Sequence, residues 1–392
     1  MSTVTTDMET PLVQGFVAPG FEAVRDELDQ VISGDAGYSA QFCAYAGGEL
    51  VIDVWGGTEI GRDSIQGVFS ATKGVAAVCI GLLVQRGALD LDAPMIRYWP
   101  EFTQGGKGDV TVRIALSHQA GLVGVEPQLT TEQLIDHDYV AARIAAQVPH
   151  WRPGTAHGYH GLTIGTMMDE LVRRIDGRTM AEFFRQEIGT PRGIDFFIAT
   201  PDDQESRVVD VLPAQPTPEQ VELLQQNPMT MDADSLAGMA FNLAASDPFN
   251  PPLSNLRAVR AAGLTAAGGT GSARGLARLY AGCISEVDGM PRLLSRETVD
   301  RVAQIQVVGN DMVLPAATRF GIVFQKPDDR LWCGSHQAFG HDGAGGAIGF
   351  ADPWHDMAYG YVPRRMSIPG GADPRGMSLA AAVRRCLADL RR

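Results

Sequence analysis

The sequence predicts a two-lobe α/β (α+β) protein, in which an antiparallel sheet with helices on its faces is built from both ends of the chain. Strand-like segments lie near both termini, at residues 38–45, 49–55, 320–325, 331–339, 346–351 and 358–362. The chain between them carries mainly the apolar spacing of helices, so strands from the two ends are expected to share one sheet. A chain of 392 residues is long enough for two lobes with a sizeable core.

The predicted α/β domain comprises residues 12–84 and 266–392, and the predicted helical domain comprises residues 85–265. Residues 201–256 are richer in Pro, Gln and Asn than their surroundings. We interpret them as an irregular insertion that covers one face of the protein.

The first predicted elements are a helix and a hairpin. Residues 20–32 have helical apolar spacing, and Gly34 follows as a stop signal. The two N-terminal strands are joined by Gly47-Gly48, a dipeptide typical of tight hairpin turns.

The middle of the chain is predicted to be helical. Apolar periodicity predicts helices at residues 110–117, 131–147, 162–175 and 179–188. The last of these has Thr179 as its N-cap and Glu182 three residues later, which is the spacing of a capping box.

The C-terminal part returns to an α/β pattern. Ser272 follows a glycine-rich segment and is expected to cap a helix over residues 273–285. Further helices are expected over residues 296–307 and 377–390, with the C-terminal strands between them.

The helix that begins near Ser70 carries the candidate chemistry. Ser70 and Lys73 are three residues apart, so their side chains lie on one face, a turn apart. The partial positive charge of a helix N-terminus favours an anion on the Ser70 oxygen. Residues 75–84 are apolar on every face, which predicts a buried helix.

Lys73 is the second candidate residue. Burial lowers the pKa of a lysine, and a neutral amine can take a proton from a nearby hydroxyl, which an arginine cannot do. Of the 32 basic residues, only Lys73, Lys107 and Lys326 are lysines. Codon usage can explain that scarcity, but it also makes a lysine at this position notable.

Composition narrows the function classes. A formal net charge of −14 argues against nucleic acid or an anionic membrane as the main partner. Five scattered cysteines without a C-x-x-C pattern are typical of reduced thiols in a cytoplasmic protein. Residues 1–14 lack the pattern of a signal peptide, and no apolar run is long enough to span a membrane. We therefore expect a soluble cytoplasmic protein, and the sequence leaves its oligomeric state open.

Five short motifs follow one another along the chain: Ser70-Ala71-Thr72-Lys73, Tyr98-Trp99-Pro100-Glu101-Phe102, Leu116-Ser117-His118-Gln119-Ala120-Gly121-Leu122, Pro153-Gly154-Thr155 and Phe339-Gly340-His341-Asp342-Gly343-Ala344-Gly345-Gly346. Together they resemble the motifs of the serine β-lactamase and penicillin-binding-protein superfamily, in the branch with the β-lactamase-like carboxylesterases (family VIII esterases). The resemblance covers the chain from about residue 12 to its end, outside the predicted insertion. It implies a β-lactamase/DD-peptidase-like fold with the active site between the two lobes.

The resemblance also implies roles for individual residues. Ser70 would be the nucleophile that forms an acyl-enzyme, and Lys73 would accept or shuttle its proton. Tyr159 stands at the place of the family's Tyr-x-Asn and would be the second proton carrier. A phenol and an amine that lower each other's pKa would share one proton near neutrality. The backbone N–H groups of Ser70 and Ala344 would form the oxyanion hole.

Three further residues match the substrate-binding positions of the family. His341-Asp342-Gly343 stands where the family has Lys-Thr-Gly, and we expect it on a strand at the edge of the site. His341 would hydrogen-bond the substrate, although a structural histidine fits the position equally well. Gly343 would let the substrate come close. Gly161 replaces the Asn of Tyr-x-Asn.

These departures favour one reaction. In β-lactam-handling relatives, the missing Asn and Lys hold the acyl amide and the substrate carboxylate. We therefore expect a serine carboxylesterase that cleaves short-chain esters, without a metal or an organic cofactor. A β-lactamase or DD-peptidase type of amidase, an acyltransferase and a penicillin-binding sensor without turnover are the alternatives on the same residues.

Other catalytic arrangements fit the sequence poorly. No serine lies in the G-x-S-x-G pattern of an α/β-hydrolase. A triad of Ser70 with His341 and Asp342 is disfavoured, because adjacent residues on a strand point to opposite faces. His157 and His160 lack an acidic third ligand for a metal, and the glycines at 268–271 lack the lysine of a phosphate-binding loop.

Overall fold

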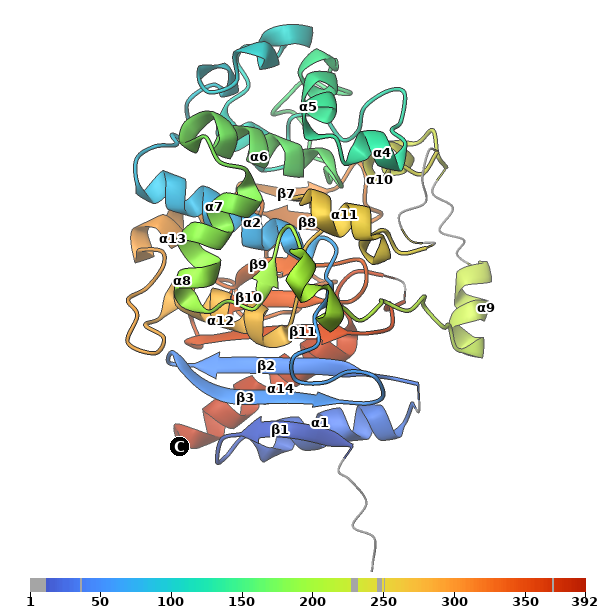
Figure 1. Ribbon diagram of the computed structural model, residues 1–392, viewed down its shortest axis with the longest axis vertical. Helices are drawn as coiled ribbons and strands as arrows, with labels where there is room; N and C mark the ends of the chain where they lie inside the picture. The colour runs from blue at the N-terminus through green and yellow to red at the C-terminus, as the bar shows by residue number, and fades with distance from the viewer. Residues whose placement is uncertain (1–11, 36, 227–231, 245–248, 250, 369) are drawn as a thin grey trace, which may run out of the picture.

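The computed structural model describes residues 12–35, 37–226, 232–244, 249, 251–368 and 370–392. Its main feature is a six-stranded sheet in the order β1-β3-β2-β11-β10-β9, with every neighbouring pair antiparallel. The strands come from both ends of the chain, which confirms the predicted sheet (Figure 1). They are β1 (Val13–Val17), β2 (Ala40–Ala46), β3 (Glu49–Gly56), β9 (Phe339–Asp342), β10 (Ile348–Asp352) and β11 (Met357–Pro363).

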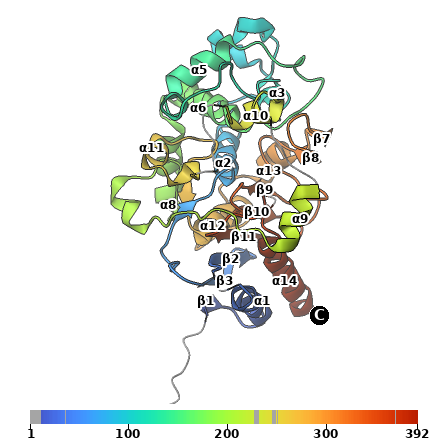
Figure 2. The same ribbon diagram turned by 90° about the vertical axis from the view of Figure 1, so that its right-hand side faces the viewer.

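Helices cover both faces of this sheet. On β2, Phe42 and Ala44 pack with α1 (Glu22–Ser33) and α14 (Pro374–Leu390), whereas Cys43 and Tyr45 join the core on the opposite face. That second face packs against α12 (Ala273–Ile284) and α2 (Ala71–Gln85). Figure 2 shows α12 and α14 on opposite sides of the strands. Because both faces are covered, β2 is apolar on both sides of its pleat.

The other half of the molecule is helical, and most of it lies above α2 in Figure 1, on the side away from the sheet, whereas α8 reaches down to the level of β10. Its elements are η1 (Met95–Arg97), η2 (Pro100–Gly106), α3 (Val112–Leu116), α4 (Thr131–Leu134), α5 (His137–Ala146), α6 (Thr163–Asp176), α7 (Met180–Phe184), η3 (Arg185–Gly189), α8 (Thr190–Arg192), α10 (Leu236–Phe241) and α11 (Arg257–Ala262). The remaining elements are η4 (Asp202–Arg207), α9 (Pro218–Gln226), η5 (Leu253–Asn255), α13 (Arg296–Ala303) and the hairpin of β7 (Val307–Asn310) and β8 (Ala317–Phe320).

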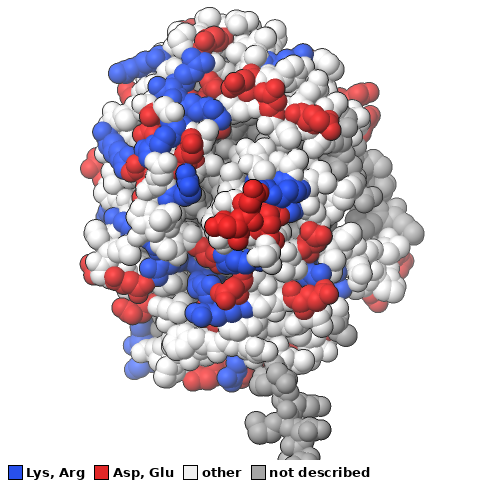
Figure 3. Space-filling view, in the orientation of Figure 1, with Lys and Arg blue, Asp and Glu red and all other residues white. Residues whose placement is uncertain are grey.

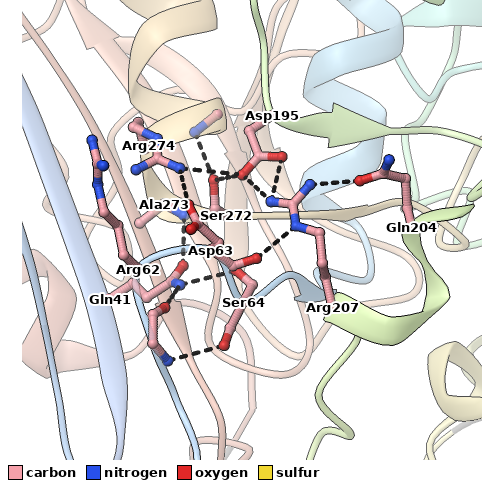
Figure 4. A network of polar contacts seen from close by, with 12 residues as sticks. Gln41, Arg62, Asp63, Ser64, Asp195, Gln204, Arg207, Ser272, Ala273 and Arg274 are labelled. Carbon is pink, nitrogen blue, oxygen red and sulfur yellow. Dashed lines mark hydrogen bonds and ion pairs between the residues drawn. The ribbon is translucent and has the colours of Figure 1, made fainter.

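A small sheet holds the chain just before α2. β4 (Gln66–Gly67) and β5 (Phe196–Phe197) pair with the two sides of β6 (Thr270–Gly271). A polar network fastens its surroundings: the Asp195 carboxylate accepts hydrogen bonds from Arg207 and from Ser272, each within 2.8 Å (Figure 4). These contacts tie residues from the predicted insertion to the α/β part, so part of the insertion is ordered structure.

Several predicted elements differ from the observed ones. The predicted helix at 131–147 is two helices: the first ends at Leu134, and Asp136 caps the second by accepting from the Tyr139 N–H. The predicted strands at 320–325 and 331–339 are largely loop, and Val323 has a φ of +64°, which a ladder does not tolerate. The predicted helix at 296–307 ends at Ala303. Conversely, the strand β1 was not predicted from the sequence.

Within the described residues, the positive charge on the surface is carried by arginine side chains. All three lysines are buried, with exposed fractions of 0% for Lys73 and Lys107 and 4% for Lys326. Basic and acidic side chains are intermixed on the face seen in Figure 3. All five cysteines are buried and free. Within the described residues, the helices are too short or too polar to cross a membrane.

Candidate active site

Ser70 is presented at the junction between the small sheet and α2. After β4, the Val68 N–H donates to the Gly269 carbonyl at 3.0 Å, and Phe69 adopts a φ of +48°. A left-handed aromatic residue is strained, so the surroundings must hold it. Thr72 does so, because its hydroxyl donates to the Phe69 carbonyl at 2.6 Å and accepts from the Gly269 N–H at 3.1 Å. The strained turn leaves Ser70 half-buried at the head of the helix.

Lys73 lies one turn further along α2 and points back to Ser70. Its Nζ is 2.9 Å from Ser70 Oγ and 2.9 Å from the Ala266 carbonyl oxygen. The side chain is fully buried, and burial lowers its pKa to about 7 against an opposing effect of Asp342. A lysine with this pKa is a neutral amine in a large fraction of molecules near neutrality, so it can accept a proton from a hydroxyl.

Tyr159 completes the group around Ser70. The Lys73 ammonium lies 5.0 Å from the centre of its ring, and its hydroxyl hydrogen-bonds Ser70. Burial raises the pKa of Tyr159 far above its usual range, and the Ser70 hydrogen bond offsets only part of that rise. The expectation that phenol and amine lower each other's pKa is therefore wrong for the phenol. Desolvation dominates, and Tyr159 stays protonated beside a lysine that can be neutral.

His341 lies on a strand, as predicted, and its ring centre is 6.1 Å from that of Tyr159. This strand, β9, is also the edge strand of the six-stranded sheet. His341 Nδ1 donates to the backbone oxygen of Asp342 at 2.6 Å, which leaves Nε2 as an acceptor. Nε2 is buried and has no partner among the described residues. Burial and the nearby Lys73 lower the pKa of His341 to about 3, so the ring is neutral. It offers a substrate a hydrogen-bond acceptor rather than a cation.

The Asp342 carboxylate lies behind the site. It accepts hydrogen bonds at 2.9 Å from Gln325 and Arg330, and at 2.8 Å from the Ala372 N–H. Its Oδ1 is 3.9 Å from His341 Nδ1, which instead donates to the backbone. These contacts do not form a triad with Ser70.

Gly343 packs against the start of α2, close to the backbone of Ser70. A Cβ on Gly343 would lie 2.0 Å from the Val68 carbonyl oxygen and 3.3 Å from the Ala71 nitrogen, so only glycine lets the end of β9 pack against the start of α2. That packing brings Ala344 to the Ser70 turn. Gly343 thus has a packing reason for being glycine, besides the expected one of admitting substrate. Within the described residues, neither the Ser70 nor the Ala344 N–H donates to a protein acceptor.

Gly161 lies where α10 meets the site. A Cβ at this position would be 2.3 Å from the Ala240 carbonyl oxygen. The space that an Asn at residue 161 would need is therefore filled by the backbone of α10.

The motif histidines have structural contacts that the sequence did not reveal. His118 has a φ of +64°, and its ring lies 5.1 Å from Tyr159 and 4.3 Å from Phe320. Its Nδ1 accepts from the His160 N–H at 3.0 Å, while His160 Nε2 accepts from the Leu122 N–H at 3.0 Å. The Leu116–Leu122 motif marked this segment as part of the site, but only the fold shows that His118 packs against the Tyr159 ring.

The histidines that flank Tyr159 in the sequence do not form a metal site. Among the described residues, no cluster of three or more His, Cys, Asp or Glu side chains could hold a metal ion. His157 instead lies 3.0 Å from the Thr318 hydroxyl.

Known proteins share this arrangement of the chain. Residues 25–383 match the Beta-lactamase family. The Esterase/beta-lactamase LipL of Mycobacterium tuberculosis is 31% identical over 374 residues, which cover 91% of this chain and 84% of LipL. The structure of EstA from Arthrobacter nitroguajacolicus Rue61a matches with a TM-score of 0.89 and 43% identity, over 96% of this chain and 99% of EstA. A family VIII carboxylesterase matches with a TM-score of 0.85 and 31% identity, over 95% of this chain and 99% of that one.

Proposed function

The chain belongs to the Beta-lactamase family and is a hydrolase of its esterase-like branch, and from this premise we propose that it cleaves short-chain carboxylic esters through an acyl-enzyme on Ser70. One observation carries the proposal: a buried lysine with a pKa of about 7 lies 2.9 Å from the Ser70 oxygen. A base with that pKa is matched to a reaction near neutral pH.

In the first step, neutral Lys73 accepts the Ser70 proton while Ser70 Oγ bonds to the ester carbonyl carbon. The N–H groups of Ser70 and Ala344 donate to the oxyanion that forms. Such a donor contributes about 3–4 kcal/mol to transition-state stabilisation. Both amides are free of protein acceptors in the described residues, as this role requires.

In the second step, the ester C–O bond breaks and the alcohol oxygen needs a proton. Tyr159 supplies it, since burial keeps the phenol protonated, and the phenol is restored by the proton that Lys73 holds. A water molecule then attacks the acyl-enzyme and gives its proton to Lys73. The acid leaves, and Ser70 recovers its hydroxyl proton.

The surroundings favour esters over lactams and peptides. His341 is neutral, so it offers no positive charge to a substrate carboxylate. The position of an amide-binding Asn is held by Gly161, with the Ala240 carbonyl directly behind it. An amide substrate would meet fewer polar partners here, whereas a simple ester needs none beyond the oxyanion hole.

A side-by-side assay tests the proposal. The protein is given p-nitrophenyl acetate and butyrate and, separately, a chromogenic cephalosporin, with Ser70→Ala as the control. We expect ester turnover to dominate and to vanish in the variant, together with covalent labelling by a phosphonylating probe. Cephalosporin turnover above ester turnover would overturn the ester preference. Labelling that persists in Ser70→Ala would overturn the choice of nucleophile.

The same assay separates the alternatives. Added short alcohols that divert the acyl group into new esters would indicate an acyltransferase. Acylated Ser70 without turnover of either substrate would indicate a sensor.

A further inference from the structure

α10 lies directly behind the Tyr159 side of the site, although it belongs to the region expected to be an irregular insertion. The backbone of α10 packs closely against two glycines. Besides Gly161, a Cβ on Gly124 would lie 2.6 Å from the Met239 carbonyl oxygen. Side chains at either glycine would push α10 away, so the helix is seated as closely as the backbones allow.

Side-chain amides fasten α10 at both ends. After the helix, Asn242 donates to the Leu129 carbonyl at 2.6 Å and accepts from the Leu129 N–H at 2.8 Å. Gln128 donates to the Ala233 carbonyl and accepts from the Ala244 N–H, both at 2.7 Å. Paired hydrogen bonds of this kind fix register as well as distance, so α10 is a built part of the site wall.

The residues that α10 presents to the site are apolar. Ala240 is fully buried in one cluster with Tyr159, Val123 and Phe320. Phe241 is half-buried, and its ring lies 6.1 Å from the Tyr159 ring at an angle of 39°. The helix sequence Leu-Ala-Gly-Met-Ala-Phe has no side-chain hydrogen-bond donor. A substrate group at this wall meets hydrocarbon and aromatic surface.

The part of an ester that meets this wall follows from the order of events. The alcohol must leave Ser70 and be replaced by water, so it needs an open path, whereas the acyl group stays on Ser70 between the two steps. Because α10 is held at both ends, we infer that it contacts the acyl group, which stays on Ser70.

We propose that α10 is the acyl-side wall of the site and that Phe241 limits the length of the acyl group, so the preferred substrates are esters of short-chain acids without an amide next to the carbonyl. This inference rests on the function proposed above. It assigns a specificity role to a helix within the predicted insertion.

The experiment measures kcat/KM for p-nitrophenyl acetate, butyrate and octanoate with the wild-type protein and with Phe241→Ala. We expect the octanoate-to-acetate ratio to rise about tenfold or more in the variant, because removing the ring opens space for several methylenes. A parallel series of ethyl, butyl and hexyl acetates should keep its wild-type dependence on alcohol length. Phe16→Ala removes an exposed ring from β1 and should change neither series.

Phe241→Leu, a smaller change, covers the case in which the alanine variant unfolds, and circular dichroism checks both. An unchanged octanoate-to-acetate ratio in a folded variant would overturn the inference, as would a change confined to the alcohol series. Failure of the proposed function looks different, because the wild-type protein would then show no Ser70-dependent ester turnover at all.

Discussion

Two fully buried lysines, Lys73 in α2 and Lys107 in the helical half, differ in what surrounds their ammonium groups. Both are 0% exposed, and burial lowers the pKa of Lys73 to about 7 and that of Lys107 to about 8. Each also lies near an aromatic ring, Tyr159 at 5.0 Å and Phe102 at 5.3 Å. Burial and ring contacts therefore do not distinguish them.

Their hydrogen-bond partners do distinguish them. Lys107 donates to three backbone carbonyls, those of Gln104 and Gln147 at 2.6 Å and that of Ala145 at 2.9 Å. A carbonyl only accepts, so all three contacts need the protonated amine, and Lys107 clamps the end of α5 to the loop around η2. Lys73 has one carbonyl and one hydroxyl. A hydroxyl can accept or donate, so Lys73 can lose a proton and still keep its partner.

The difference teaches that a buried lysine becomes a base through the chemistry of its neighbours as well as through its burial. The lowered pKa makes proton loss possible at both positions. Only at Lys73 is the neutral amine offered a hydroxyl proton to accept.

The largest expected effect on kcat comes from replacing Lys73, the proposed base. Lys73→Arg should lower kcat for p-nitrophenyl butyrate by about 10³-fold or more, nearly as much as Lys73→Ala, because a guanidinium cannot release its proton. Steady-state kinetics on folded protein measures this. If the arginine variant kept most of the wild-type kcat, Lys73 would act only as a fixed charge.

The next substitution removes the phenol hydroxyl near Lys73 and keeps the Ser70 hydroxyl. Tyr159→Phe puts beside Lys73 the same kind of ring that Lys107 has. We expect kcat to fall by about 10²-fold, the lower end of a proton-transfer contribution, because the alcohol loses its proton donor. Poorer leaving groups such as ethyl esters should suffer more than p-nitrophenyl esters. Equal losses for both kinds of ester would place Tyr159 outside leaving-group protonation.

The third substitution removes Lys107, which holds the end of α5 to the loop around η2. Lys107→Met should lower the free energy of unfolding by about 3 kcal/mol, since three backbone carbonyls lose their charged donor. Urea denaturation measures the loss, and kcat per folded molecule should stay close to that of the wild type. A large fall in kcat with unchanged stability would contradict the division of roles between the two lysines.

The smallest expected effect is a pH dependence. The neutral form of Lys73 is the active one, so kcat/KM should fall about tenfold per unit as pH drops below about 7, and should level off above it. The Lys107→Met variant should show the same fall of kcat/KM at low pH. A profile that is flat from pH 5 to 8 would mean that Lys73 does not titrate as the base.

Stability has a related pH dependence. The folded pKa of Lys73 lies below its unfolded value of 10.5, so between about pH 7 and 10.5 the unfolded chain binds more protons than the folded one. The contribution of Lys73 to stability therefore rises with pH across that window. Lys107 acts in the same direction from about pH 8.

Much of the frame was predictable from local sequence signals. The Gly47-Gly48 turn lies between β2 and β3, Ser272 caps α12 by accepting from the Gly275 N–H, and Thr179 forms the predicted capping box with Glu182. These signals act over three or four residues, so they survive whatever packs around them. The pairing of strands from the two termini followed from their order in the chain.

The errors arose where long-range contacts outweigh local patterns. The apolar segment at 331–339 resembles a strand, but most of it is a loop. The helix predicted over 131–147 is a different kind of error, because it missed a local signal: Asp136 accepts from the Tyr139 N–H and begins a new helix. The predicted domain boundaries at residues 84 and 265 stay a prediction. The pairing of β5 with β6 joins a strand of the predicted helical domain to one of the predicted α/β domain.

For the site, the sequence by itself determined the order Ser70-x-x-Lys73 on an apolar helix, because a turn of helix places those two side chains together without outside help. Only the tertiary structure decided the rest. Burial that raises the pKa of Tyr159, burial that keeps His341 neutral, and the seating of α10 against Gly161 all depend on groups far apart in the chain. The physical reason is that desolvation and hydrogen-bond partners belong to the surroundings of a residue, which the chain creates only when it folds.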